Sequence, residues 1–177
     1  LYIAAWNGHL EVARVLIEAQ ANVDQPRESG ATPLFIAAQK GYLEVARVLI
    51  EAQANVDQPM KDGWTPLFVA AQKGHLEVAR VLIEAQANID QAMNNGVTPL
   101  YFAAWSGYLE VARVLIEAQA NVDQPMDDGE TPLYIAALNG HVEVARVLIE
   151  AKAHLDQPDE DGRTPLFYAA QFGHLEV

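Results

Sequence analysis

Apolar positions along this chain fall into two helical patterns that return at a constant interval. The longer pattern reads Leu-Glu-Val-Ala-Arg-Val-Leu-Ile-Glu-Ala from Leu43 and recurs nearly unchanged. Its apolar residues leave little more than one polar stripe, which holds Glu44, Arg47 and Glu51. Such a pattern predicts a helix that packs between neighbouring helices and turns the polar stripe to solvent.

A shorter helix is predicted before each of these, beginning at Thr-Pro-Leu and containing two adjacent alanines. Threonine is a preferred N-cap, and proline suits the first helical position because it has no N–H to leave unpaired. A glycine such as Gly41 or Gly74 follows, where a left-handed turn is cheapest. The paired alanines, such as Ala70-Ala71, are small enough to let adjacent repeats approach closely, and we expect a larger residue there to destabilise the stack by roughly 1–3 kcal/mol.

The two patterns and the turns between them form a repeat. A turn dipeptide such as Asp62-Gly63 precedes each Thr-Pro and predicts a hairpin tip. The spacing from Thr32 to Thr65 is 33 residues and is kept at every later Thr-Pro-Leu, a period that predicts a solenoid of stacked units. We interpret 1–177 as one array, in which the partial repeat is 1–26, the full repeats are 27–59, 60–92, 93–125 and 126–158, and the truncated repeat is 159–177.

This period, the Thr-Pro-Leu motif and second-helix starts of the type Gly-His-Leu-Glu-Val resemble the ankyrin repeat family over the whole chain. The resemblance implies an all-α solenoid of stacked helix-turn-helix units with short β-hairpin or turn tips. It also implies a non-enzymatic, non-covalent protein-protein interaction module. Such a module binds a partner protein through its hairpin tips and the concave face of its first helices.

Three features depart from the family pattern. Aromatic residues occupy the position of the family's histidine, so its hydrogen bond is lost or rebuilt, and their regular spacing suits packing between repeats; they are Tyr2, Phe35, Phe68, Tyr101, Tyr134 and Phe167. The family glycine after the second helix is a glutamine such as Gln53, which would be strained if the backbone there is left-handed. The family's Asp-Val-Asn is reversed in Asn55-Val56-Asp57, for which the sequence alone offers no physical reason.

Comparing the repeats with one another separates a constant scaffold from a varied face. Residues 43–60 are identical to 109–126, whereas differences concentrate in the hairpin tips and the first helices. Drift at exposed positions would also produce variation, but all three tryptophans lie in the varied set, and tryptophan often anchors interfaces. We therefore expect partner binding by Trp6, Lys40, Trp64, Lys73, Trp105, Leu138 and Phe172.

Charge narrows the class of partner. Asp and Glu number 24 against 11 Lys and Arg, a net charge of −13 that repels phosphate, so neither nucleic acid nor an anionic membrane is an expected partner. The hairpin tips become more acidic towards the C-terminus. We expect a partner that presents basic residues to that end, where the acidic residues are Asp127, Asp128, Glu130, Asp159, Glu160 and Asp161.

The residues that carry catalysis or metal binding are sparse. Cysteine is absent, neither a phosphate-binding glycine loop nor a nucleophile elbow occurs, and we predict no catalytic residue, metal site or cofactor. His9, His75, His141 and His174 share one repeat position and should lie too far apart to hold one metal ion. The lack of a signal peptide and of a membrane-spanning run favours an intracellular, cytoplasmic location.

Two further interpretations remain open at this point. The near-identical second helices also suit a structural spacer or scaffold, natural or designed, that has no recognition face of its own. The chain ends lie inside repeats, so Leu1, Tyr2 and Ile3 at one end, and Leu175 and Val177 at the other, should expose apolar surface. End-to-end self-association through these uncapped terminal repeats would cover that surface.

Overall fold

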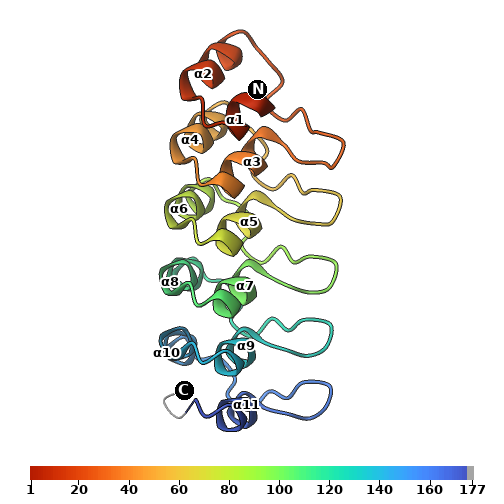
Figure 1. Ribbon diagram of the computed structural model, residues 1–177, viewed down its shortest axis with the longest axis vertical. Helices are drawn as coiled ribbons and strands as arrows, with labels where there is room; N and C mark the ends of the chain where they lie inside the picture. The colour runs from red at the N-terminus through yellow and green to blue at the C-terminus, as the bar shows by residue number, and fades with distance from the viewer. Residues whose placement is uncertain (175–177) are drawn as a thin grey trace. The chain divides into compact units, whose positions relative to one another are not determined.

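The computed structural model describes residues 1–174 and has eleven α-helices and no β-strand in that range (Figure 1). The chain divides into two compact units, Leu1–Asn88 and Ile89–Val177. The boundary lies in the loop that follows the sixth helix, inside the repeat 60–92. None of the described helices is long and apolar enough to cross a membrane.

The first unit contains three repeats in two layers of helices. The first helices of the repeats pack against one another in chain order, and the second helices form the other layer (Figure 1). The first layer consists of α1 (Tyr2–Trp6), α3 (Pro33–Lys40) and α5 (Pro66–Lys73). The second layer consists of α2 (Leu10–Glu18), α4 (Leu43–Glu51) and α6 (Leu76–Glu84).

The second unit repeats this two-layer arrangement. Its first layer consists of α7 (Pro99–Ser106), α9 (Pro132–Leu138) and α11 (Pro165–Gln171). Its second layer consists of α8 (Leu109–Glu117) and α10 (Val142–Glu150), which pack against each other. Within each unit the helices therefore stack as helix-turn-helix repeats that contact one another in chain order, as the period predicts.

The helix boundaries follow from the predicted caps. At the start of α3 the Thr32 hydroxyl accepts a hydrogen bond from the Phe35 N–H at 3.1 Å, and proline takes the first helical position. The same cap begins α5, α7, α9 and α11. Gly41 closes α3 with a φ of +74°, and a Cβ there would lie 2.7 Å from the His75 ring. This glycine is thus required both by the turn and by the close approach of the next repeat.

The core lies between the two layers and between successive repeats. Leu34, Leu67 and Leu82 are fully buried, as are the paired alanines of the inner first helices. The aromatic residues Phe35 and Phe68 are also buried, as predicted for packing between repeats, whereas Phe167 of α11 is 49% exposed. The first helices nevertheless vary at a buried position as well, which Ile36, Val69 and Ile135 occupy. In these three repeats that side of the helix faces the core, so variation at this position does not mark a surface that a partner could reach there.

The hairpin tips are tight turns rather than strands. In the first tip the Arg27 N–H donates to the Ala31 carbonyl at 2.9 Å, and the Gly30 N–H donates back to the Arg27 carbonyl at 2.9 Å. Neighbouring tips are joined by one backbone bond, from the Lys61 N–H to the Ser29 carbonyl at 3.1 Å. The tips of one unit therefore lie side by side at a fixed spacing.

The reversed Asn-Val-Asp segment has a structural reason. The Asn55 side-chain oxygen accepts the Asp57 N–H at 3.0 Å and closes a local turn. The Asp57 carboxylate then accepts the Asn88 N–H of the next repeat at 2.8 Å. Asp24 binds the Asn55 N–H in the same way, and in the second unit Asp90 binds that of Asn121 and Asp123 that of His154. Each of these four aspartates thereby holds the loop of the following repeat.

Apolar residues are exposed in the first and last repeats. Val12 and Val15 of α2 are exposed, whereas the equivalent valines of α4 are buried. Leu166 of α11 is likewise exposed, whereas the equivalent residues Leu34, Leu67, Leu100 and Leu133 are buried. Self-association through these surfaces stays a prediction, and Leu175 and Val177 lie outside the described residues.

Replacing Gln53 by glycine should stabilise the chain by about 1 kcal/mol, because an L-residue in the left-handed conformation costs roughly that much. Gln53 has a φ of +63° and an exposed side chain, so the change removes strain without removing a buried contact. Urea denaturation followed by circular dichroism measures the difference. Gln53→Ala is the control, since it keeps a Cβ in the strained conformation. Equal stability of the Gly and Ala variants would contradict this account.

Replacing Asp57 by alanine should lower the free energy of unfolding by about 1–2 kcal/mol, because it deletes a charge-assisted bond to the next repeat. Asp62→Ala is the matched control, since Asp62 is an exposed aspartate at a hairpin tip of the same repeat. Both variants are compared with the parent by urea denaturation. If the two variants lose the same stability, the Asp57 bond does not link the repeats as described.

Candidate functional site

The varied face comprises the hairpin tips and the last turns of the first helices. The hairpin tips are residues 27–31, 60–64, 93–97, 126–130 and 159–163. In each unit the tips project from the first helices on the side opposite the second helices (Figure 1). The second helices turn a constant polar stripe outwards, where the Arg47 and Glu44 side chains lie 3.8 Å apart and exposed. Exposed pairs of this kind contribute only a few tenths of a kcal/mol.

Three large apolar side chains on the varied face are exposed to solvent. The exposed fractions are 43% for Trp6, 49% for Trp105 and 54% for Phe172. All three lie at or just beyond the C-terminal end of a first helix, where a small buried alanine, Ala5, Ala104 or Ala169, takes the side that faces the core. Their exposure is what a set of binding anchors requires, because only accessible aromatic surface can be buried by a partner.

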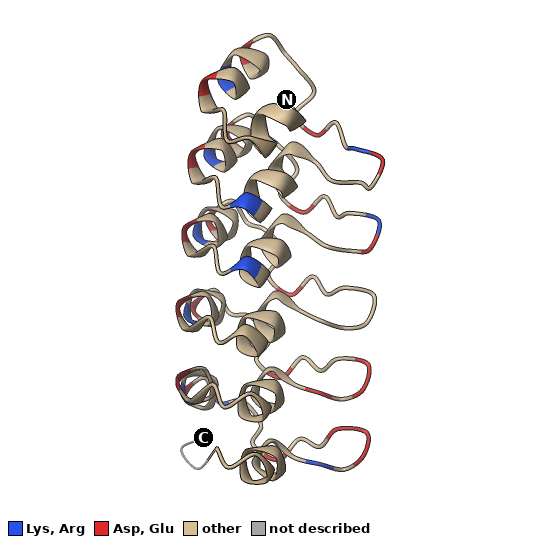
Figure 2. Cartoon of the chain, viewed as in Figure 1, with Lys and Arg blue, Asp and Glu red and all other residues tan. Residues whose placement is uncertain are grey.

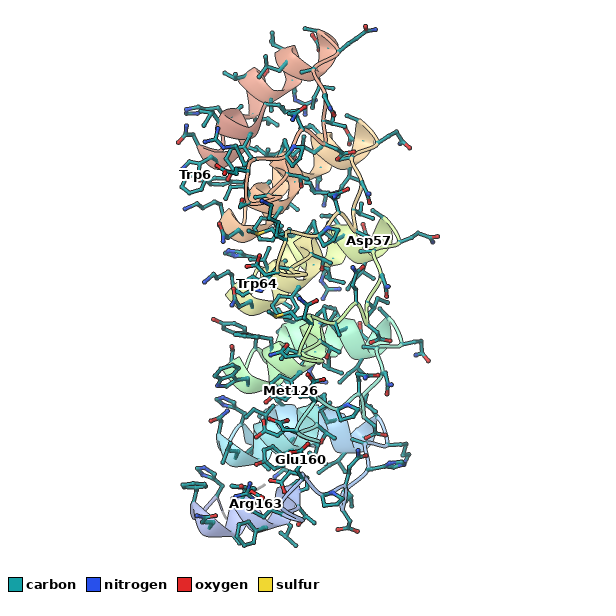
Figure 3. All side chains as sticks on the ribbon, turned by 90° about the vertical axis from the view of Figure 1, so that its right-hand side faces the viewer. Trp6, Asp57, Trp64, Met126, Glu160 and Arg163 are labelled. Atoms are coloured by element: carbon teal, nitrogen blue, oxygen red, sulfur yellow. The ribbon has the colours of Figure 1, made fainter. Side chains whose placement is uncertain are left out.

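In the first unit, Lys40 and Trp6 lie together. The Lys40 Nζ atom is 4.5 Å from the centre of the Trp6 ring, a cation–π contact between the ends of α3 and α1. Figure 3 places Trp6 and Asp57 on opposite sides of this unit. Lys73 ends α5 and is also exposed.

Trp64 and Leu138 are less accessible than the other predicted anchors. Both are half-buried, and the Trp64 ring packs on the Phe68 ring with their centres 5.3 Å apart. Trp64 also belongs to the backbone closure of its hairpin tip, because its carbonyl accepts the Met60 N–H at 2.9 Å. Part of its surface therefore stabilises its own repeat.

Inter-repeat hydrogen bonds fix the last turn of α7, which carries Trp105. The Trp105 carbonyl accepts a bond from the His141 Nε2–H at 2.9 Å and another from the Asn139 side chain at 3.4 Å. His75 donates in the same way to the Gln39 carbonyl at 3.1 Å. These histidines thus serve packing, and the described residues contain no group of side chains that could hold a metal ion.

Two tyrosines rebuild a side-chain hydrogen bond between repeats. The Tyr101 hydroxyl donates to the Glu130 carboxylate at 2.5 Å, and the Tyr134 hydroxyl donates to Asp159 at 3.2 Å. Burial raises the pKa of Tyr101 well above its ordinary value, and the bond to Glu130 raises it further. The carboxylates of Glu130 and Asp159 are therefore already hydrogen-bonded within the chain, and they are less available to a basic partner than the sequence suggests.

Asp159 is the centre of the last hairpin tip. It is buried and accepts the Arg163 side-chain and backbone N–H groups, each at 2.9 Å, together with the Asp161 N–H at 3.0 Å. Burial alone would raise its pKa, but these bonds and the Arg163 charge lower the pKa below its usual value. Arg163 also pairs with the Asp161 carboxylate.

The remaining tip carboxylates of the second unit face solvent. Asp127, Asp128 and Glu160 are exposed, and Figure 2 shows the acidic tips of the last two repeats. The Glu160 N–H donates to the Asp128 carbonyl at 3.0 Å, so the two tips stay side by side. This arrangement concentrates negative charge along one edge of the unit.

A hollow on the varied face of the first unit was not predicted from the sequence. It has a volume of about 720 Å³ and is lined by Tyr2, Ile3, Trp6, Arg27, Glu28, Ser29 and Lys61. The signal available was that Ile3, Arg27 and Lys61 all occupy varied positions. The regular spacing of the aromatic residues predicts only packing between repeats for Tyr2, so it does not indicate that the Tyr2 ring also lines this hollow.

Comparison with known families accounts for the entire repeat pattern. The family model described as ankyrin repeats in three copies matches residues 1–60, 52–126 and 119–177. Comparison with curated proteins gives no match. The matched segments together span both units, and each unit has the paired helices and hairpin tips that the repeat motif implies. The chain belongs to the ankyrin repeat family.

Proposed function

We propose that this chain is a non-covalent protein-protein interaction module that binds its partner through the varied face. Ankyrin repeats generally serve as protein interaction modules. The observation that carries the proposal is the position of the exposed aromatic residues. Trp6, Trp105 and Phe172 all lie on the face where repeats differ, while the second helices behind them stay constant.

The physical basis is the cost of leaving these rings in water. Burying a large aromatic side chain at an interface is strongly favourable, and a few such anchors carry most of the binding energy. Trp105 is supported by the Phe102 ring, whose centre lies 5.0 Å away, and Phe172 stacks on Tyr168 at 6.2 Å. Anchors supported in this way lose little conformational freedom when a partner covers them.

The partner proposed for the second unit presents basic residues. The exposed Asp127, Asp128 and Glu160 lie on adjacent hairpin tips, beside the first helices that carry Trp105 and Phe172. A Lys- or Arg-rich segment that also carries bulky apolar side chains would match both features. Long-range attraction to these carboxylates would speed its association.

Capture of partners from cell extracts tests the proposed face. The double variant Trp105→Ala, Phe172→Ala should lose proteins that the parent chain retains, and a purified partner should bind it about tenfold more weakly or worse. Tyr42→His, Tyr108→His is the matched control. It removes two exposed aromatic side chains at the start of α4 and α8 and installs the residue of other repeats.

Equal helicity and melting temperature are required of both variants before capture. Loss by the Trp105, Phe172 variant alone supports the proposal. If the parent retains nothing, or if both variants retain the same proteins as the parent, binding through this face is refuted. The chain would then be better described as a structural spacer.

The rate of association tests the basic partner. With a partner captured through the second unit, the association rate constant should fall markedly as salt is raised. Replacing Asp127, Asp128 and Glu160 by their amides should slow association at low salt. The matched control carries amides at Glu44, Glu77 and Glu110 of the second helices and should not slow it. An association rate that does not respond to salt would contradict this assignment.

A further inference from the structure

We propose that Asn95 is a site of spontaneous deamidation, which adds a carboxylate to the hairpin tip 93–97. Water is the only co-reactant. This covalent change is independent of the proposed function. Its consequence for a basic partner does rest on the proposed function, because the new charge would lie beside the acidic tips of the second unit.

Asn95 precedes a glycine in an exposed turn outside the helices. The Asn95 side chain is exposed, and the Gly96 N–H donates to the Met93 carbonyl at 3.0 Å. Three other tips have aspartate at this position and close with the same bond at 3.0 Å; these aspartates are Asp62, Asp128 and Asp161. The turn of the tip 93–97 can therefore hold the acid as well as the amide.

The fold requires glycine at position 96. Gly96 has a φ of +83°, and a Cβ atom there would lie 2.9 Å from the Met126 Cα atom of the adjacent tip. A side chain after an asparagine shields the peptide nitrogen that attacks during deamidation, whereas glycine leaves that nitrogen open. Close packing of the two tips thus keeps a reactive neighbour next to Asn95.

The Asn95 side chain is folded back over the residues that follow it. Its Oδ1 atom accepts the Val97 N–H at 3.4 Å, and this turn holds the Asn95 Cγ atom near the Gly96 nitrogen. The Val97 N–H also points at the oxygen on which negative charge develops during attack, and so stabilises that charge. Attack further requires the Gly96 N–H to leave the Met93 carbonyl, which is a local opening of one turn.

The reaction is a cyclisation followed by hydrolysis. The Gly96 nitrogen gives its proton to solvent and bonds to the Asn95 Cγ atom, the Cγ–Nδ2 bond breaks, and ammonia leaves. Water then opens the cyclic imide at either carbonyl, which gives aspartate or isoaspartate. In sum, the amide and water give an acid and ammonia without oxidation or reduction. The net charge of −13 becomes more negative by one.

The other asparagines that precede glycine lack this geometry. Asn7 and Asn139 end α1 and α9 in the right-handed helical conformation. The Asn139 amide nitrogen donates to the Trp105 carbonyl at 3.4 Å, which directs the side chain to the preceding repeat. Within residues 1–174, Asn95 is the one asparagine before glycine whose side-chain oxygen accepts a backbone N–H. Asn95 should therefore react first.

The new carboxylate would extend the acidic edge of the second unit. The Asp127 N–H donates to the Asn95 carbonyl at 3.2 Å, so the tip 93–97 lies beside the tip that carries the exposed Asp127 and Asp128. An aspartate at position 95 would strengthen the negative field there and speed the association of a basic partner. Deamidation would thus change the recognition properties of the chain as it ages.

Peptide mapping by mass spectrometry, after incubation of the full chain at mildly alkaline pH, tests the modification. Deamidation at Asn95 should be about tenfold faster than at Asn139, because opening the exposed tip costs less than opening the helix end. Asn139 is the matched control, since it precedes glycine in the same unit. If Asn95 stays an amide, or reacts no faster than Asn139, the proposal is wrong.

Association kinetics with a labelled peptide of lysine and phenylalanine test the consequence. At low salt the aged parent chain and Asn95→Asp should associate about twofold faster than the fresh parent, and high salt should remove the difference. Asn95→Ser installs the residue of the first tip and should keep its rate on ageing. Gln119→Glu is the charge control, because it adds one negative charge just after α8, in the layer opposite the tips, and should associate like the fresh parent (Figure 1).

The outcomes separate this inference from the proposed function. Equal association of Asn95→Asp and the fresh parent, or an equal gain in Gln119→Glu, would refute the effect on binding. If the parent does not bind the basic peptide, that effect and the basic partner both fail, while peptide mapping still decides whether Asn95 is modified. Partner capture that depends on Trp105 and Phe172 would leave the proposed function intact even if Asn95 proves unreactive.

Discussion

The contact between successive repeats is the interaction on which each unit depends. A single helix pair cannot bury its own apolar residues, so Phe35 and Phe68 become buried only when repeats stack. Directional bonds reinforce this contact on both sides of the helices, from the His75 ring to the Gln39 carbonyl and from the Asn88 N–H to the Asp57 carboxylate. These groups set the distance between repeats, and none of them is a side chain of the varied face. Residues of the varied face can therefore differ between repeats without loss of the fold.

The sequence predicts the helix caps and turns, which depend on neighbouring residues, but only some of the contacts between repeats. The Thr32 cap follows from one residue and its neighbours, and this prediction is confirmed. Whether Gln53 keeps the left-handed conformation of the family glycine was left open by the sequence, and its φ of +63° shows that it does. The link made by Asp57 could not be foreseen, because its acceptor role depends on where the stack places the Asn88 N–H. The burial of the varied residue Val69 could not be foreseen either, since variation between repeats does not reveal which side of a short helix is buried.

The candidate site, too, could be predicted from the sequence only where a feature does not depend on contacts between distant residues. Trp6 and Trp105 were expected on the varied face from their residue type and from the variation between repeats, and both are exposed there. The half-buried state of Trp64 depends on its packing against Phe68, which no spacing rule specifies. The hollow beside Tyr2 combines residues of three repeats and is visible only after folding. Charge on the hairpin tips also differs between units, because the first two tips carry both signs of charge and the last two carry mostly carboxylates.

Hydrogen–deuterium exchange of the chain, free and bound to a captured partner, tests the central claim most directly, because it locates the bound surface without any substitution. The account predicts slower exchange in the hairpin tips and the last turns of the first helices, with little change in α8 and α10. Slower exchange concentrated in α8 and α10, with the hairpin tips unchanged, would contradict it.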